Sequence, residues 1–134
     1  MTDRELIVSA LNAMKNSYSP YSHFRVGAAL LCADGTVYTG CNVENASFGA
    51  TNCAERTAVF KAVSEGKRDF KALAVVGGKN GAVEALCHPC GICRQVLAEF
   101  CGADFRIVLF DGKNTVSHTL SELLPFAFTH DDVR

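Results

Sequence analysis

The stretch His88-Pro89-Cys90-Gly91-Ile92-Cys93-Arg94-Gln95 places two thiols three residues apart behind a proline. Proline at the first position of a helix is preset for helical geometry, so the pattern predicts that Cys90 and Cys93 lie on one face of a first helical turn. Two such sulfurs can bind one metal ion. Because an open catalytic zinc site takes three protein ligands and one water, we expect a third ligand elsewhere in the chain.

The third ligand that we expect is Cys53, in the stretch Thr51-Asn52-Cys53-Ala54-Glu55-Arg56. Two residues turn a helix by roughly 200°, so Glu55 does not share the ligating direction of Cys53 and can approach a metal-bound water from another side. Ligands in open α/β sheets gather where parallel strands end. If the strands before the two cysteine-bearing helices are parallel, Cys53 therefore meets Cys90 and Cys93.

Hydrophobic periodicity and turn residues predict an α/β fold for the whole chain, residues 1–134, as one domain. Asp34-Gly35 is typical of a hairpin turn between two antiparallel strands. The expected order is a helix, a hairpin, then strand, helix, strand and helix, which indicates a three-layer α-β-α sandwich with a mixed five-stranded sheet. We expect helices near 3–16, 53–65 and 90–101, a short helix after Thr119, and strands near 25–32, 36–43, 72–76, 106–110 and 115–118.

Several local features refine this expectation. Thr2-Asp3-Arg4-Glu5 and Thr119-Leu120-Ser121-Glu122 both have the pattern of a capping box at a helix start. Residues 77–88 are expected to form a glycine-rich loop. The third helix is expected to turn four apolar residues towards the core: Ile92, Val96, Leu97 and Phe100.

Composition limits the classes of function. The 134 residues are 49% hydrophobic and carry a net charge of −1, so a nucleic-acid polymer is a poor partner and a small substrate is favoured. No apolar run is long enough to span a bilayer, and the polar N-terminal segment is unlike a secretory signal, so we expect no membrane partner and a cytoplasmic protein. In a reducing compartment, cysteines that are not ligands, such as Cys32, Cys41 and Cys101, are expected to be small buried side chains.

Cys53-Ala54-Glu55 followed by Pro89-Cys90-Gly91-Ile92-Cys93 resembles the zinc signature of the cytidine/deoxycytidylate deaminase family. Three further stretches resemble the small homotetrameric cytidine deaminases, and together they extend the resemblance over nearly the whole chain: Tyr21-Ser22-His23-Phe24, Asn42-Val43-Glu44-Asn45-Ala46 and Leu123-Leu124-Pro125. The resemblance implies a homotetramer that deaminates cytidine and deoxycytidine to uridine and deoxyuridine, with release of ammonia, in pyrimidine salvage.

The resemblance also implies roles at the metal. Cys53, Cys90 and Cys93 would hold one Zn²⁺ per chain, and Glu55 would shuttle protons while a zinc-bound water attacks C4 of the pyrimidine. Arg56 would donate hydrogen bonds to a ligand thiolate and so offset the charge of three thiolates. The alternative for Arg56 is an ordinary surface arginine.

Substrate recognition is expected at the end of the second strand. Asn42 and Glu44 project to one side there, and an amide and a carboxylate so placed can pair with sugar hydroxyls. By resemblance this pair binds the ribose, Phe24 packs against the base, and the backbone of Ala54 contacts the polar edge of the base. The alternative for Asn42 is ordinary loop chemistry.

Two aromatic residues extend the resemblance to a subunit interface. Phe128 matches a family position that reaches into a neighbouring subunit's site. Phe48 lies where relatives often carry tyrosine, so a polar contact from this position is in doubt. The alternative for Phe126 and Phe128 is that they close the chain's own core.

Other readings of the cysteines remain open. Cys87 extends the run to three cysteines at every third position, a spacing used by iron–sulfur clusters, with Cys101 or Cys53 as the fourth ligand. The same ligands would suit a closed structural zinc module, and Cys87 or His88 could replace Cys53 at a zinc site. Among deaminases, blasticidin-type enzymes and enzymes acting on nucleotides are alternatives.

Overall fold

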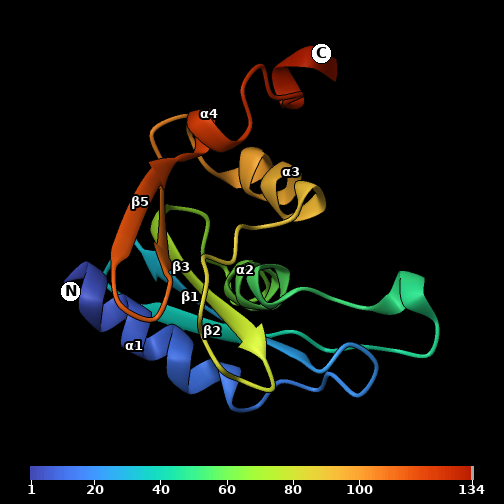
Figure 1. The fold of residues 1–134 in the computed structure, drawn as a ribbon. Helices are drawn as coiled ribbons and strands as arrows, with labels where there is room; N and C mark the ends of the chain where they lie inside the picture. The colour runs from blue at the N-terminus through green and yellow to red at the C-terminus, as the bar shows by residue number, and fades with distance from the viewer. Residues whose placement is uncertain (134) are drawn as a thin grey trace.

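A computed structural model describes residues 1–133 and contains one five-stranded sheet, in the order β2-β1-β3-β4-β5 (Figure 1). The strands are β1 (Phe24–Cys32), β2 (Val37–Cys41), β3 (Phe70–Lys79), β4 (Arg106–Phe110) and β5 (Thr115–Thr119). The helices are α1 (Asp3–Met14), α2 (Ala54–Ser64), α3 (Gly91–Phe100) and α4 (Leu120–Leu123), with short 3₁₀ turns η1 (Phe48–Ala50) and η2 (His130–Val133). In the described part of the chain, no helix is long and apolar enough to cross a membrane.

The directions of the strands decide where the site lies. β1 is antiparallel to both of its neighbours, β2 and β3, so β2 and β3 run the same way. β3 and β4 are parallel, and β4 and β5 are antiparallel. The sheet is therefore mixed, as expected. The segments that leave β2 and β3 towards α2 and α3 start from the same edge of the sheet, which is the arrangement that a shared metal site needs.

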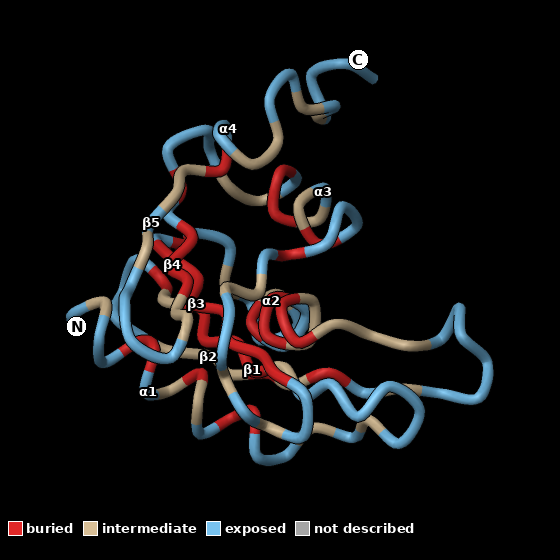
Figure 2. The backbone as a smooth tube through the Cα atoms, viewed as in Figure 1, coloured by how far each residue is buried: buried red, intermediate tan, exposed pale blue. Residues whose placement is uncertain are grey.

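Helices cover both faces of the sheet and complete the three expected layers (Figure 1). α1 packs against one face, where Gly27 lets the helix backbone come so close that an added Cβ would lie 2.0 Å from the Ala10 carbonyl oxygen. α2 packs against the other face across Gly40, and α3 joins the same core cluster. Figure 2 shows the buried positions concentrated along the central strands and the helix faces turned towards them.

Local signals in the sequence placed the turns and caps correctly. Gly35 in the β1–β2 hairpin and Gly112 in the β4–β5 hairpin have positive φ, the left-handed conformation that glycine adopts most readily. Thr119 and Glu122 form a complete capping box at the start of α4. At α1 the Thr2 side chain accepts a hydrogen bond from the backbone of Glu5.

Three expectations were wrong. β3 does not end at Val76 but continues through Gly77 and Gly78, because β1 is long enough to pair with it as far as Lys79. Gly78 has room for no side chain, since an added Cβ would lie 1.8 Å from a backbone oxygen. Ile92 does not face the core. It is 62% exposed, because Cys93, Leu97 and Ala98 are the buried residues of α3. The third, the position of Pro89, concerns the metal centre.

Candidate metal centre

Both cysteine-bearing helices begin one residue later than expected. Cys53 is the N-cap of α2 and Cys90 the N-cap of α3, each with extended backbone, and neither side chain caps its own helix. Pro89 therefore precedes the cap instead of occupying the first helical position. Arg94 fixes this turn by donating from Nε to the Pro89 carbonyl oxygen at 2.7 Å and from Nη1 to the Leu123 carbonyl oxygen at 2.6 Å. The two cap sulfurs are thus free to face each other.

The three expected sulfurs do meet. The Sγ atoms of Cys53 and Cys90 are 3.6 Å apart, those of Cys90 and Cys93 are 3.5 Å apart, and all three lie within 4.8 Å of one another. Zn–S bonds of about 2.3 Å in tetrahedral geometry place sulfurs about 3.8 Å apart, so the cluster fits a zinc ion. Three soft thiolates also favour zinc over magnesium or calcium. This is the only such group of three metal-binding side chains among residues 1–133.

Arg56 supplies positive charge to the cluster. Its Nη2 donates a hydrogen bond to Cys53 Sγ at 3.2 Å. Hydrogen bonds that Cys53 accepts from Cys93 and Arg56 lower the pKa of Cys53 to about 5. The pKa of Cys93 is raised, because its thiol donates a hydrogen bond to Cys53 and because it is buried. Arg56 is not an ordinary surface arginine: its Nε is buried and has no partner in the described chain.

Glu55 is the buried acid of the site. Its side chain is only 4% exposed, and it lies in the first turn of α2, directly after the segment that carries Cys53. Burial is the main cause that raises the pKa of Glu55 to about 7, and the negative charge of Cys53 adds to it. A surface acid that merely favours a helix start would not be buried in this way. A carboxyl group with this pKa can both accept and release a proton near neutral pH.

A cavity of about 210 Å³ opens beside the cluster. Its wall includes the cluster residues Cys53 and Cys90 and the acid Glu55. The remaining wall residues are Val26, Asn42, Thr51, Asn52, Ala54, Cys87 and His88. Sequence reasoning did not assign Val26, Thr51 or Asn52 to the site. Only their positions could have indicated them: Val26 lies in β1, the strand beside β2, and Thr51 and Asn52 directly precede Cys53.

The expected substrate-binding residues are divided between two places. Asn42 and Ala54 line the cavity. Phe24, Glu44 and Phe128 are not part of its wall in this single chain. Phe24 and Glu44 lie at the start of β1 and after β2, and Phe128 lies beyond α4, where its carbonyl oxygen accepts a hydrogen bond from Gln95 Nε2 at 2.7 Å. The structure therefore brings together the metal and acid residues but only part of the substrate set.

The rival cysteines do not join the cluster. Cys87 lines the cavity, yet its sulfur is not one of the three grouped sulfurs, and burial raises its pKa to about 12. Burial likewise raises the pKa of Cys101 to about 12. Neither sulfur belongs to the group formed by Cys53, Cys90 and Cys93, and this separation argues against an iron–sulfur run. Cys32 is buried, as expected, while Cys41 and Cys101 are only partly buried.

Comparison with known proteins adds an independent line. The model of the family described as "Cytidine and deoxycytidylate deaminase zinc-binding region" matches residues 1–109. A cytidine deaminase of Sporosarcina psychrophila is 51% identical over 134 residues, 99% of this chain and 96% of that protein. A cytidine deaminase of Halalkalibacterium halodurans is 52% identical over 133 residues, 98% of each chain. The crystal structure of cytidine deaminase from Burkholderia pseudomallei superposes with a TM-score of 0.88 at 46% identity, covering 96% of this chain and 100% of that chain.

Proposed function

This chain belongs to the cytidine and deoxycytidylate deaminase family, and on that premise we propose that it hydrolyses cytidine and deoxycytidine to uridine and deoxyuridine with release of ammonia. The observation that carries the proposal is the buried carboxyl group of Glu55 beside three clustered sulfurs in one cavity. Neither an electron carrier nor a closed structural zinc module has a use for such an acid.

Cys53, Cys90 and Cys93 hold one zinc ion per chain. When bound, zinc supplies a Lewis acid that makes water nucleophilic near neutral pH. Three thiolates leave the centre with a formal charge of −1, which weakens that effect. Arg56, through its hydrogen bond to Cys53, and the N-termini of α2 and α3 supply compensating positive charge.

Glu55 moves the protons. It accepts a proton from the attacking water and delivers it to N3 of the pyrimidine; it then accepts the remaining proton of that water from the new hydroxyl group on C4 and delivers it to the departing amine, which leaves as ammonia. Its place in the cavity wall, beside two of the clustered cysteines, supports this role, because a group that moves protons between water and substrate has to lie next to both. The backbone of Ala54, which also lines the cavity, contacts the polar edge of the base.

Asn42, Glu44 and Phe24 recognise the nucleoside. Asn42 and Glu44 bind the ribose, and Phe24 packs against the base. Free cytosine lacks the sugar hydroxyl groups that Asn42 and Glu44 would bind, so nucleosides are preferred over the free base.

The active assembly is a homotetramer. Pockets for small molecules usually measure about 300–1,000 Å³, whereas the cavity of one chain measures about 210 Å³. This small volume supports a site that residues of neighbouring chains help to enclose. Exposed aromatic residues are available for this: Phe48 is 78% exposed and Phe128 60%. Phe126 is also exposed, so these C-terminal aromatic residues do not close the chain's own core. Phe128 enters a neighbour's site in the assembly, and a fully active monomer in sedimentation would contradict this.

In the cell, the protein acts in the cytoplasm on free pyrimidine nucleosides, in pyrimidine salvage. Residues 1–134 form one deaminase domain. The net charge of −1 offers no general attraction to a nucleic-acid strand, which supports a small-molecule substrate.

Glu55→Gln tests the proposed function. The amide has nearly the same shape as the acid but cannot accept a proton, so the turnover of cytidine, followed by ultraviolet absorbance, falls by at least about 10³-fold. Zinc content, measured by atomic absorption, stays at one ion per chain because Glu55 is not a ligand. Substantial activity in this variant would overturn the assignment of Glu55, and loss of zinc would show that Glu55 supports the metal instead.

A further inference from the structure

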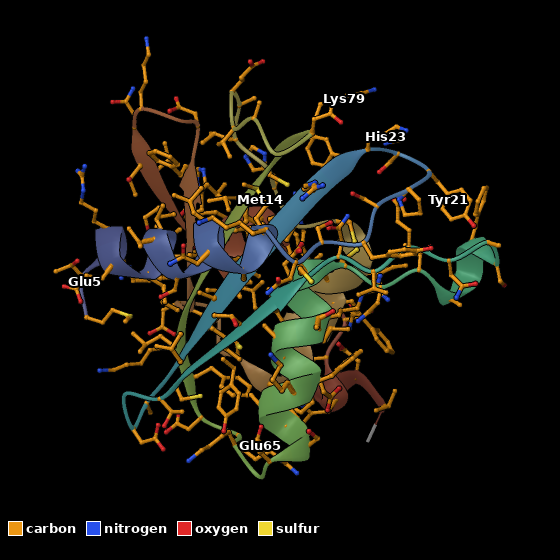
Figure 3. All side chains as sticks on the ribbon, turned by 90° about the horizontal axis from the view of Figure 1, so that it is seen from below. Glu5, Met14, Tyr21, His23, Glu65 and Lys79 are labelled. Atoms are coloured by element: carbon orange, nitrogen blue, oxygen red, sulfur yellow. The ribbon has the colours of Figure 1, made fainter. Side chains whose placement is uncertain are left out.

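Residues 17–22, which join α1 to β1, run alongside residues 42–44, which follow β2. The backbone N–H of Tyr18 donates to the Asn42 carbonyl oxygen at 3.1 Å, and that of Glu44 donates to the Tyr18 carbonyl oxygen at 2.8 Å. Tyr18 and Val43 form an isolated parallel bridge. Figure 3 labels Tyr21 and His23 on this connection, at the same end of the sheet as Lys79, the last residue of β3. The 17–22 segment is therefore attached to the stretch that carries Asn42 and Glu44.

The carboxylate of Glu44 is held by this segment. Oε1 accepts hydrogen bonds from the backbone N–H groups of Tyr21 at 2.9 Å and Ser22 at 3.1 Å, and Oε2 accepts one from the Ser22 hydroxyl group. The bond to the Ser22 side chain is the main cause that lowers the pKa of Glu44. A carboxylate offers about four acceptor positions, so one position stays open for a ligand hydroxyl group.

Asn42 and Phe24 belong to the same network. The Asn42 side chain donates from Nδ2 to the Phe24 carbonyl oxygen at 2.8 Å. Its Oδ1 accepts from the backbone N–H of Val26 at 2.9 Å and from the Ser17 hydroxyl group. The backbone N–H of Phe24 donates to Ser22 Oγ at 3.0 Å. Two serine hydroxyl groups thus connect the three residues to which we assign nucleoside recognition, and neither serine lines the cavity.

We propose that Ser22, assisted by Ser17, is a positioning residue for nucleoside recognition. Its hydroxyl group holds the Glu44 carboxylate and the Phe24 backbone in their bound arrangement before the nucleoside arrives. This rests on the proposed function, because Glu44 and Phe24 matter only if a sugar and a base bind there. Side chains that are held in advance lose less conformational freedom on binding, so the gain falls on affinity and not on the chemical step.

Ser22→Ala tests the proposal through substrates that differ only in the sugar. The KM for cytidine rises by about tenfold, whereas kcat stays within about twofold and zinc content is unchanged. With 2′,3′-dideoxycytidine, which lacks the hydroxyl groups that Glu44 and Asn42 would bind, KM rises by no more than about threefold. Ser22→Thr keeps the hydroxyl group and restores most of the affinity for cytidine.

Ser19→Ala is the matched control. Its hydroxyl group belongs to the same segment, but its only described side-chain contact is Ser17 Oγ at 3.3 Å, so the KM for cytidine changes by less than about twofold. If Ser22→Ala does not fold, Ser17→Ala carries the same test through Asn42. The expected rise in KM is then about threefold, because Asn42 Oδ1 keeps its bond from Val26.

The possible outcomes distinguish a failure of the positioning role from a failure of the proposed function. A wild-type protein that holds zinc but does not turn over cytidine would overturn the proposed function and the positioning role with it. An active wild-type protein whose Ser22→Ala variant keeps its KM, or loses affinity equally for cytidine and the dideoxynucleoside, would overturn only the positioning role.

Discussion

The starts of α2 and α3 are held very differently from the loop of residues 44–51 in the same chain. The turns that carry the sulfurs lie at the same edge of the sheet, after β2 and β3. α2 packs against β2 across Gly40, and Glu55 is buried. The 44–51 loop is closed at its base by paired hydrogen bonds between Val43 and Asn52 and then projects away from the sheet (Figures 1 and 2). At its tip, Phe48 is largely exposed, and its ring lies edge-on to the ring of Tyr21 at a centroid distance of 6.3 Å.

This difference separates the chemistry from substrate recognition. The sheet and its helices place the three sulfurs and Glu55 together, so one chain carries the groups to which we assign the reaction. The exposed aromatic residues are not fixed by the chain's own core, so they can contribute to a pocket only when something covers them. Zinc binding should therefore be a property of the single chain, and full affinity for the nucleoside a property of the assembly.

The largest effect should come from removing a sulfur ligand at the start of α2 or α3. Cys53→Ala lowers zinc to less than about 0.1 ion per chain and abolishes turnover, because two cysteines cannot complete a catalytic site. Metal analysis of the purified variant checks this. Cys87→Ala is the matched control, since Cys87 lines the same cavity outside the cluster, and it keeps one zinc per chain. Tight zinc binding by Cys53→Ala would show that Cys87 or His88 is the third ligand.

Glycine substitutions compare the two regions directly. A Cβ at Gly40 would lie 2.5 Å from the Ala54 carbonyl oxygen, so Gly40→Ala pushes α2 away from β2 and lowers the free energy of unfolding by about 1–3 kcal/mol. A Cβ at Gly49, in the projecting loop, would have no neighbour within 4 Å, so Gly49→Ala changes it by less than about 0.5 kcal/mol. Urea unfolding measures both. Equal effects would contradict the contrast between the regions.

The smallest effect on activity should come from removing an exposed aromatic ring, and this change should leave the starts of α2 and α3 intact. Phe128→Ala keeps zinc at one ion per chain and raises the KM for cytidine by about tenfold, if the proposed role of this ring, covering the substrate in a neighbouring chain, is correct. Steady-state kinetics and sedimentation of the same sample check this. An unchanged KM in an intact tetramer would remove Phe128 from the site.

The parts that the sequence predicted are those that depend on local patterns. β4 was predicted at its exact bounds, and the hairpin glycines and the Thr119 capping box were correct, because turns and caps are set by residues close in the chain. The meeting of Cys53 with Cys90 and Cys93 was also predictable, because strand direction follows from the order of the elements.

The parts that failed depend on contacts between distant residues. Gly77 and Gly78 look like a loop, but the length of β1 keeps them in the sheet. Ile92 fits the apolar stripe of α3, but the buried face of this helix carries Cys93, which belongs to the sulfur cluster. Ile92 is therefore turned towards the surface. The bonds from Ser17 and Ser22 join residues more than twenty positions apart, and no local pattern indicates them.

The most direct test of the central claim is the ultraviolet absorbance of cytidine over time with purified protein, repeated after zinc has been removed and again after it has been restored. We predict that the absorbance falls with the zinc protein, stays constant with the stripped protein, and falls again when one zinc per chain is restored. No change in absorbance with protein shown to hold zinc would contradict the assignment of cytidine as substrate.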